Sequence, residues 1–196
     1  MNQYLDALKY VLENGADRQS RTGIATRAVF GMQLRFNMED GFPAMTTKKL
    51  PWKSVASELL WFIEGSNDER RLAEILHGTR DKSKTTIWTA NAEADYWKPK
   101  AKFEGDLGRV YGVQWRKWKS PYGREIDQLA EAIKLIKTNP TSRRIIVTAW
   151  NPGELNQMAL PPCHAFFQFF VADNKLSLQM YQRSCDMFLG VPFNIA

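Results

Sequence analysis

The feature that most limits the possible folds is a pair of strand-like segments separated by only two residues. The first, HAFFQFFVA, covers 164–172, and the second, KLSLQMYQRS, covers 175–184. Asp173 and Asn174 between them suit the left-handed backbone of a two-residue hairpin turn. Both strands carry apolar side chains on both faces of the pleat, which predicts a sheet that is covered on both sides.

Helical patterns surround this hairpin. Apolar residues at helical spacing predict a helix over 2–14, and Pro51 suits the start of a second helix through SVASELLWFIEG. Further elements are expected as helices over 68–77 and 125–140, strands over 28–36 and 143–150, and an irregular stretch over 78–108 with a surface insertion at 92–104. This mixture predicts the α+β class, with a mixed, largely buried β-sheet covered by helices. A single domain over residues 1–196 is expected from the chain length.

Charge and cysteine content narrow the class of protein. The net charge of +6 suits a polyanionic partner, but the arginines stand singly or in pairs, without a long basic block. Small phosphorylated ligands explain this pattern at least as well as a nucleic-acid surface does. Two cysteines, no signal-peptide pattern and no apolar run of membrane-spanning length predict a cytoplasmic protein without disulfides or membrane association.

Cys163 stands in LPPCH, and its role has several readings. A free cysteine is commonly a small buried apolar residue. Pro161 and Pro162 fix the backbone before this thiol, however, and a strand follows it. That position suits a nucleophile, and nearby cations would favour its thiolate form.

A metal site and a cysteine–histidine hydrolase are the competing readings of Cys163. Two cysteines and two histidines at positions 77, 163, 164 and 185 match no zinc-site spacing, so no metal is predicted. Neighbouring residues on a strand point to opposite faces, so His164 is not expected to act as the base for Cys163. His77 is a base candidate that no pattern supports.

Arginines at the ends of loops and strands suggest a phosphate site. Arg21 lies in SRTG, Arg143 and Arg144 follow a turn, and Arg183 precedes Ser184 at the end of a strand. A single arginine is more often a solvated surface charge, but several at such junctions favour a phosphate clamp. Glu58, within the apolar SVASELLWFI, either faces solvent or is buried with a raised pKa that would allow proton transfer near neutral pH.

Six segments together resemble the thymidylate synthase family, in the family's order and over nearly the whole chain. They are SRTG, GFPAMTTKK, GRVYGVQWR, SRRIIVTAWNP, LPPCH and YQRSCDMFLGVPFNIA. The resemblance implies reductive methylation of 2′-deoxyuridylate (dUMP) to thymidylate (dTMP), with 5,10-methylenetetrahydrofolate as one-carbon donor and reductant and dihydrofolate as product. Cys163 then adds to carbon 6 of the pyrimidine. A homodimer is implied as well, with a face of the sheet at its interface and with Arg143 and Arg144 donated to the partner's site.

The resemblance also assigns roles to individual positions. The catalytic residues would be Cys163, Glu58, Arg183 and Asn194. The nucleotide would be bound by Arg21, Arg143, Arg144, Gln182, Arg183, Ser184, Asp186, Asn194, Tyr111 and His164. The folate would be bound by Lys48, Trp88, Asp186, Leu189, Gly190, Phe193 and Ala196.

Asn194 carries the specificity argument. Its amide can accept a hydrogen bond from N3–H of uracil and donate one to O4, and cytosine reverses both groups. A deoxycytidylate-modifying relative is therefore disfavoured, since such enzymes carry aspartate at the matching position. A nucleotide- or RNA-binding fragment is the remaining alternative, and the basic pI of 9.3 is its main support.

Three departures accompany the resemblance. Thr89 replaces the commoner aspartate after Trp88, Leu50-Pro51 differs from common versions of that loop, and the stretch TTIWTANAEADYWKPKAKFEGDLG differs in length and composition. The chain also ends in the apolar run FLGVPFNIA. We expect the C-terminal part of the family fold to be absent, and a literal 196-residue chain to have very low activity.

Overall fold

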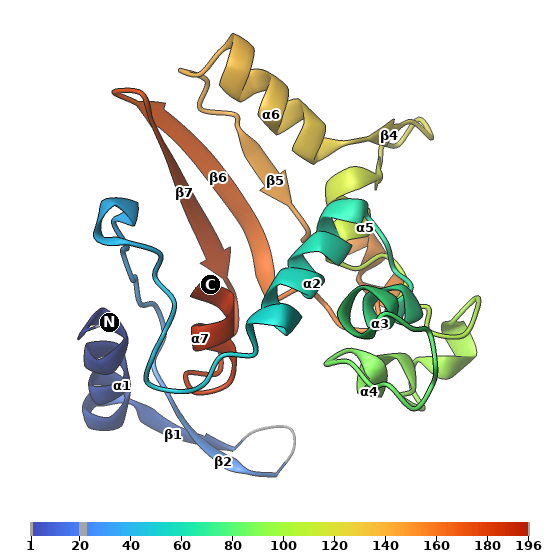
Figure 1. Cartoon of the computed structure of the whole chain (residues 1–196), viewed down its shortest axis with the longest axis horizontal. Helices are drawn as coiled ribbons and strands as arrows, with labels where there is room; N and C mark the ends of the chain where they lie inside the picture. Colours follow the sequence, from blue (N-terminus) through green and yellow to red (C-terminus); the bar gives the residue numbers. More distant parts are fainter. Residues whose placement is uncertain (1, 20–22, 196) are drawn as a thin grey trace. The chain divides into compact units, whose positions relative to one another are not determined.

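The predicted hairpin is confirmed as β6 (His164–Ala172) and β7 (Lys175–Gln182). A computed structural model describes residues 2–19 and 23–195. In it Asp173 and Asn174 have φ values of 50° and 58°, as a two-residue turn of this kind requires. A third strand, β5 (Ile146–Thr148), pairs with β6, so the strand order is β5-β6-β7 (Figure 1). This three-stranded sheet is antiparallel throughout.

The chain forms two compact units, which are described separately. The larger unit comprises residues 52–185, and the smaller comprises residues 1–51 together with 186–196. The α+β class is confirmed, because the chain combines helices with strands that pair antiparallel.

The larger unit contains the three-stranded sheet and most of the helices. Its helices are α2 (Trp52–Glu64), α3 (Glu69–His77), α4 (Thr89–Ala92), α5 (Tyr111–Arg116) and α6 (Gln128–Thr138). Its short elements are the pair β3 (Trp118–Lys119) and β4 (Glu125–Ile126), with the 3₁₀ helices η2 (Lys98–Lys100) and η3 (Pro152–Gln157).

Local residues explain where the predicted helices begin and end. Asp68 caps α3 by accepting the backbone N–H of Arg70 at 2.9 Å, and Gly78 ends the helix in a left-handed conformation, with φ 77°. Asp127 caps α6 in the same way, and α6 ends just before Asn139-Pro140.

One face of the sheet packs against α6, and the other is exposed. Val147 is fully buried on the packed face, where Phe167 and Phe169 also join the core of α2, α5 and α6. On the opposite face Phe170 is 62% exposed and Tyr181 51% exposed. The expectation of a mixed sheet is wrong, because all three strands are antiparallel, and the helices of this unit cover one of the two faces. Apolar composition alone does not tell a face covered by the same chain from one left open.

The smaller unit is built around α1 (Asn2–Asn14), which matches the prediction. Its other elements are the hairpin β1 (Ala16–Gln19) and β2 (Ala25–Ala28), the 3₁₀ helix η1 (Met38–Asp40) and α7 (Gly190–Ile195). Tyr4, Met45 and Val191 are buried together at its centre.

The strand predicted over 28–36 is wrong. Within this range the structure shows strand only at Ala28, the last residue of β2, and the rest is irregular. Gly31 takes φ 79°, which interrupts an extended chain, and the side chain of Phe30 is fully exposed. The apolar alternation instead lets Leu34 and Phe36 pack against the small core from an irregular segment.

The stretch 78–108 is largely irregular, as expected. It is not only a surface insertion, however, because some of its side chains are buried in the larger unit. Trp97 is 2% exposed, and its indole N–H donates to the carbonyl of Asp106 at 2.6 Å. The carboxylate of Asp106 accepts from the Asn67 side chain at 2.6 Å and from the Lys102 backbone at 2.8 Å. Among residues 2–19 and 23–195, no helix is both long and apolar enough to cross a bilayer.

Candidate active site

Cys163 lies immediately before β6, and two hydrogen bonds hold its backbone in place. Its N–H donates to the hydroxyl oxygen of Tyr111 at 2.7 Å, and its carbonyl accepts the N–H of Arg183 at 2.9 Å. The residue is partly buried and forms no disulfide. Cys163 therefore lies where α5, β6 and β7 meet, and contacts from two distant parts of the chain fix its backbone.

Tyr111 connects this position to the core. Its ring stacks on Phe62 with centroids 4.7 Å apart and meets Trp88 edge-on at 5.8 Å. Burial, and next the nearby Cys163, raises the pKa of Tyr111, so the phenol stays protonated at neutral pH. Tyr111 has φ 21°, which is unusual for a non-glycine residue and is typical of strained backbone at functional sites.

Arg183 turns its guanidinium onto the loop that carries Cys163. Its Nε donates to the carbonyl of Pro162 and its Nη2 to the carbonyl of Pro161, both at 2.9 Å. The guanidinium carbon also lies 5.3 Å from the ring centre of Trp150. A permanent positive charge is thereby held beside the cysteine loop, where it can attract an anion.

Glu58 and Trp88 form a further hydrogen bond in the larger unit. The indole N–H of Trp88 donates to Oε1 of Glu58 at 2.6 Å, from a ring that is 6% exposed. Burial raises the pKa of Glu58 to about 7, although the hydrogen bond from Trp88 acts in the opposite direction. A carboxyl group that titrates near neutral pH can both take up and release a proton.

His164, Gln182 and Ser184 lie next to Cys163 and Arg183 along the two strands. His164 pairs with Gln182 across β6 and β7, with a register irregularity before Phe166. The imidazole of His164 lies 5.5 Å from the Tyr111 ring. Ser184 comes directly after Arg183, beyond the end of β7, and is exposed.

Arg143 and Arg144 are not brought to Cys163 within one chain. Both are exposed and precede Ile146, which pairs with Gln168 near the middle of β6. At about 3.3 Å per strand residue, they lie roughly 20 Å from Cys163 along the strand direction.

The predicted residues of the smaller unit cluster around α7. Asp186 accepts the backbone N–H groups of Phe188 at 2.9 Å and Leu189 at 2.6 Å, and its own carbonyl accepts from Gly190. Lys48 donates to the carbonyl of Phe188 at 3.1 Å and lies over its ring. Phe193 and Asn194 are partly buried on α7. Arg21 and Ala196 lie outside the described residues.

The sequence analysis missed two supporting residues. Trp150 lies beneath the Arg183 guanidinium, and Tyr4 donates to the carbonyl of Met187 at 2.7 Å, which ties α1 to the segment before α7. An aromatic residue at the end of the strand predicted over 143–150 was the available signal for Trp150. Nothing local to Tyr4 distinguishes it from other residues of an amphipathic helix.

Taken together, the larger unit offers a partly buried thiol, a held guanidinium and a carboxyl group of near-neutral pKa. This combination suits covalent chemistry on an anionic substrate that also needs proton transfer. In a comparison with protein families, the family model described as thymidylate synthase matches residues 2–196, which is nearly the whole chain.

Proposed function

Since the chain belongs to the thymidylate synthase family, whose members methylate dUMP to dTMP, we propose that it does so with Cys163 as the nucleophile. The observation that carries this proposal is the position of Cys163, held between the Tyr111 hydroxyl and the Arg183 backbone. The thiol adds to carbon 6 of the pyrimidine, which makes carbon 5 nucleophilic. Covalent addition thus divides one difficult step into two easier ones.

5,10-Methylenetetrahydrofolate, the co-substrate of the family, supplies the one-carbon unit and the reducing hydride when bound. The residues around α7 fit such a ligand, because the exposed side chains of Phe188 and Leu189 lie near a lysine. Apolar surface suits the ring system and Lys48 suits the carboxylate tail. Asp186, Gly190 and Phe193 complete this proposed set of the smaller unit, and Trp88 is proposed for the folate on the resemblance alone.

We propose that Arg183 and the residues near it bind the nucleotide. Arg183, with Ser184, would hold the phosphate. Gln182, His164 and Tyr111 would line the nucleotide site. Asn194 would select uracil by its donor and acceptor pattern, and Arg21 is proposed for the phosphate on the resemblance alone.

Glu58 is proposed to move protons around the pyrimidine. A pKa of about 7 leaves both of its protonation states populated at neutral pH, which suits alternate uptake and release. The hydrogen bond from Trp88 orients Oε1, so the second oxygen can face the substrate.

The proposal includes a homodimer formed through the exposed face of the sheet. Phe166, Phe170 and Tyr181 make this face apolar, and a hollow of about 380 Å³ opens on it beside Arg183 and Trp150. Large exposed apolar faces are typical of protein interfaces. Arg143 and Arg144, roughly 20 Å from their own Cys163, would serve the partner's nucleotide phosphate.

The test is covalent trapping with 5-fluoro-dUMP and methylenetetrahydrofolate, read by intact mass spectrometry. Fluorine at carbon 5 cannot leave as a proton does, so a competent thiol stays attached to both molecules. We expect the adduct in the unmodified protein and in Cys185→Ser, and none in Cys163→Ser. An adduct mapped to Cys185, or none in folded unmodified protein, would overturn the proposal.

A further inference from the structure

A buried ion pair in α3 has no place in the proposed chemistry. Glu69 and Arg70 are 2% and 8% exposed, and their side chains are in direct contact. Burying two charges costs free energy unless the remaining donors and acceptors are also satisfied. The partners of this pair therefore indicate what the pair is for.

Arg70 uses its three nitrogens within the chain. Nε and Nη2 each donate to a carboxylate oxygen of Glu69 at 2.6 Å. Nη1 donates to the carbonyls of Asp81 and Lys84, at 2.8 and 3.1 Å. The guanidinium therefore fixes the irregular loop that leads to Trp88.

Glu69 holds the residues on both sides of Trp88. Its Oε1 accepts the hydroxyls of Thr86 at 2.7 Å and Thr89 at 2.6 Å. The Thr89 hydroxyl oxygen accepts the backbone N–H of Thr86 at 2.8 Å, and the Thr86 hydroxyl oxygen accepts that of Trp88 at 3.1 Å. Trp88 is the N-cap residue just before α4 and provides no side-chain cap, so these threonines fix its backbone.

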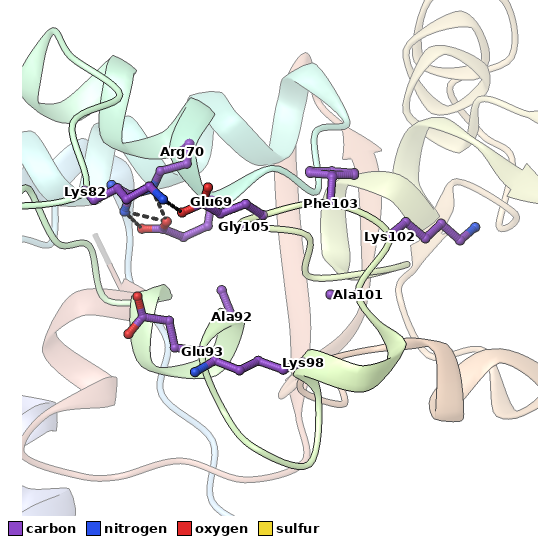
Figure 2. Close-up of a pocket in the computed structure, with 11 residues that line it drawn as sticks. Glu69, Arg70, Lys82, Ala92, Glu93, Lys98, Ala101, Lys102, Phe103 and Gly105 are labelled. Atoms are coloured by element: carbon purple, nitrogen blue, oxygen red, sulfur yellow. Dashed lines mark hydrogen bonds and ion pairs between the residues drawn. The ribbon is translucent and has the colours of Figure 1, made fainter.

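A hollow of about 550 Å³ borders this network (Figure 2). Glu69 and Arg70 lie on one side of it, with Glu93 and Lys98 on the opposite side. A ligand site would need donors or acceptors directed into the hollow. Nη1 of Arg70 and Oε1 of Glu69 are instead engaged with the loop over 81–89, which favours a role in positioning that loop.

We propose that Glu69, Arg70 and Thr89 are positioning residues that hold Trp88 so that its indole N–H meets Glu58. The relevance of this contact to catalysis rests on the proposed function, whereas the contact itself does not. Thr89, which stands where the family commonly has aspartate, is one of the residues that join the buried pair to the loop, and it lies directly after Trp88.

Thr89→Val tests the proposal, with Thr89→Ser as the matched control. Valine keeps the shape but removes the hydroxyl, and serine retains it. The readout is the ¹⁵N–¹H resonance of the Trp88 indole, assigned by its loss in Trp88→Phe. In unmodified protein and in Thr89→Ser, this resonance should titrate with Glu58; in Thr89→Val it should shift and lose that titration.

Kinetics give the second readout. We expect Thr89→Val to lower kcat/KM for the folate by about tenfold, since small misplacements of catalytic groups are costly. The KM for dUMP should stay unchanged, and Thr89→Ser should restore the folate value.

An unchanged Trp88 resonance and titration in folded Thr89→Val would overturn the proposal and leave the network a role in stability alone. If the resonance responds as expected but the unmodified protein traps no 5-fluoro-dUMP, the positioning contact stands and the proposed function fails. The two failures are therefore distinguishable.

Discussion

Glu58 illustrates how packing changes the chemistry of a single side chain. Its neighbours Leu59 and Leu60 are about half exposed, whereas Trp61 is fully buried, so the side chains around the helix differ sharply in environment. The carboxyl group falls on the side where protein surrounds it, and burial raises its pKa to about 7. The indole N–H of Trp88 is the hydrogen-bond donor to this carboxyl group.

This raised pKa predicts a pH-dependent stability. Between the ordinary pKa of 4.5 and about 7, folded protein keeps a proton on Glu58 that the unfolded chain has released. Stability should therefore fall as pH rises through this window, by at most about 3 kcal/mol. Glu58→Gln removes the titration, so urea unfolding at pH 5 and pH 8 should show the unmodified protein losing stability relative to the variant.

Glu64 on the same helix provides the control. Its hydrogen bond from Arg71 helps to lower its pKa, so its contribution is present at neutral pH and is lost as the solution becomes acidic. Glu64→Gln should therefore differ from the unmodified protein by a constant amount between pH 5 and pH 8, and that difference should shrink only below the ordinary pKa of 4.5. A difference between Glu58→Gln and the unmodified protein that stays constant with pH would contradict the assignment.

At the level of elements, the two contacts of Asp127 at the start of α6 can be tested separately. Asp127 accepts the N–H of Ala130 at 2.9 Å and also pairs with Arg116 at 2.9 Å. Asp127→Ala removes both and should lower the free energy of unfolding by about 1 kcal/mol. Asp127→Asn keeps the cap and should cost clearly less, because a partly exposed ion pair contributes little.

Denaturant unfolding monitored by circular dichroism measures both variants. Equal losses in Asp127→Ala and Asp127→Asn would mean that the contact with Arg116, rather than the cap, stabilises the start of α6.

Elements were predicted well where local signals agreed. The helix start at Asp68, its end at Gly78 and the turn at Asp173 and Asn174 depend on residues close in sequence. The strand expected over 28–36 failed because alternation says nothing about whether a neighbouring strand is available to complete the hydrogen bonds.

At the level of the whole molecule, one prediction follows from the exposed face of the sheet and from the distance between Cys163 and the pair Arg143 and Arg144. In a dimer with shared sites, Cys163→Ser and the double variant Arg143→Ala/Arg144→Ala should each be inactive alone. After subunit exchange in an equal mixture, half of the dimers are mixed, and each has one site with an intact thiol and intact arginines. Activity should recover to about a quarter of the unmodified value.

Two further substitutions show whether the sheet face carries this exchange. Phe170→Glu in both chains should abolish the recovery, because it places a charge on the apolar face. Tyr122→Glu, at a site that is 96% exposed in a loop, should leave it intact. No recovery in the original mixture, with mixed dimers detected by mass, would contradict shared sites.

The sequence by itself determined the hairpin, the capped helices and the family, because each rests on neighbouring residues or on the order of short segments. Cys163 was singled out in the same way, by its prolines and the strand that follows. Only the tertiary structure decided which carboxyl group is desolvated, which tyrosine holds the cysteine and which tryptophan lies beneath Arg183. The reason is separation: Glu58 and Trp88 are 30 positions apart, and Tyr111 and Cys163 are 52. Contacts over such distances, and the loss of water that shifts a pKa, depend on how the whole unit packs.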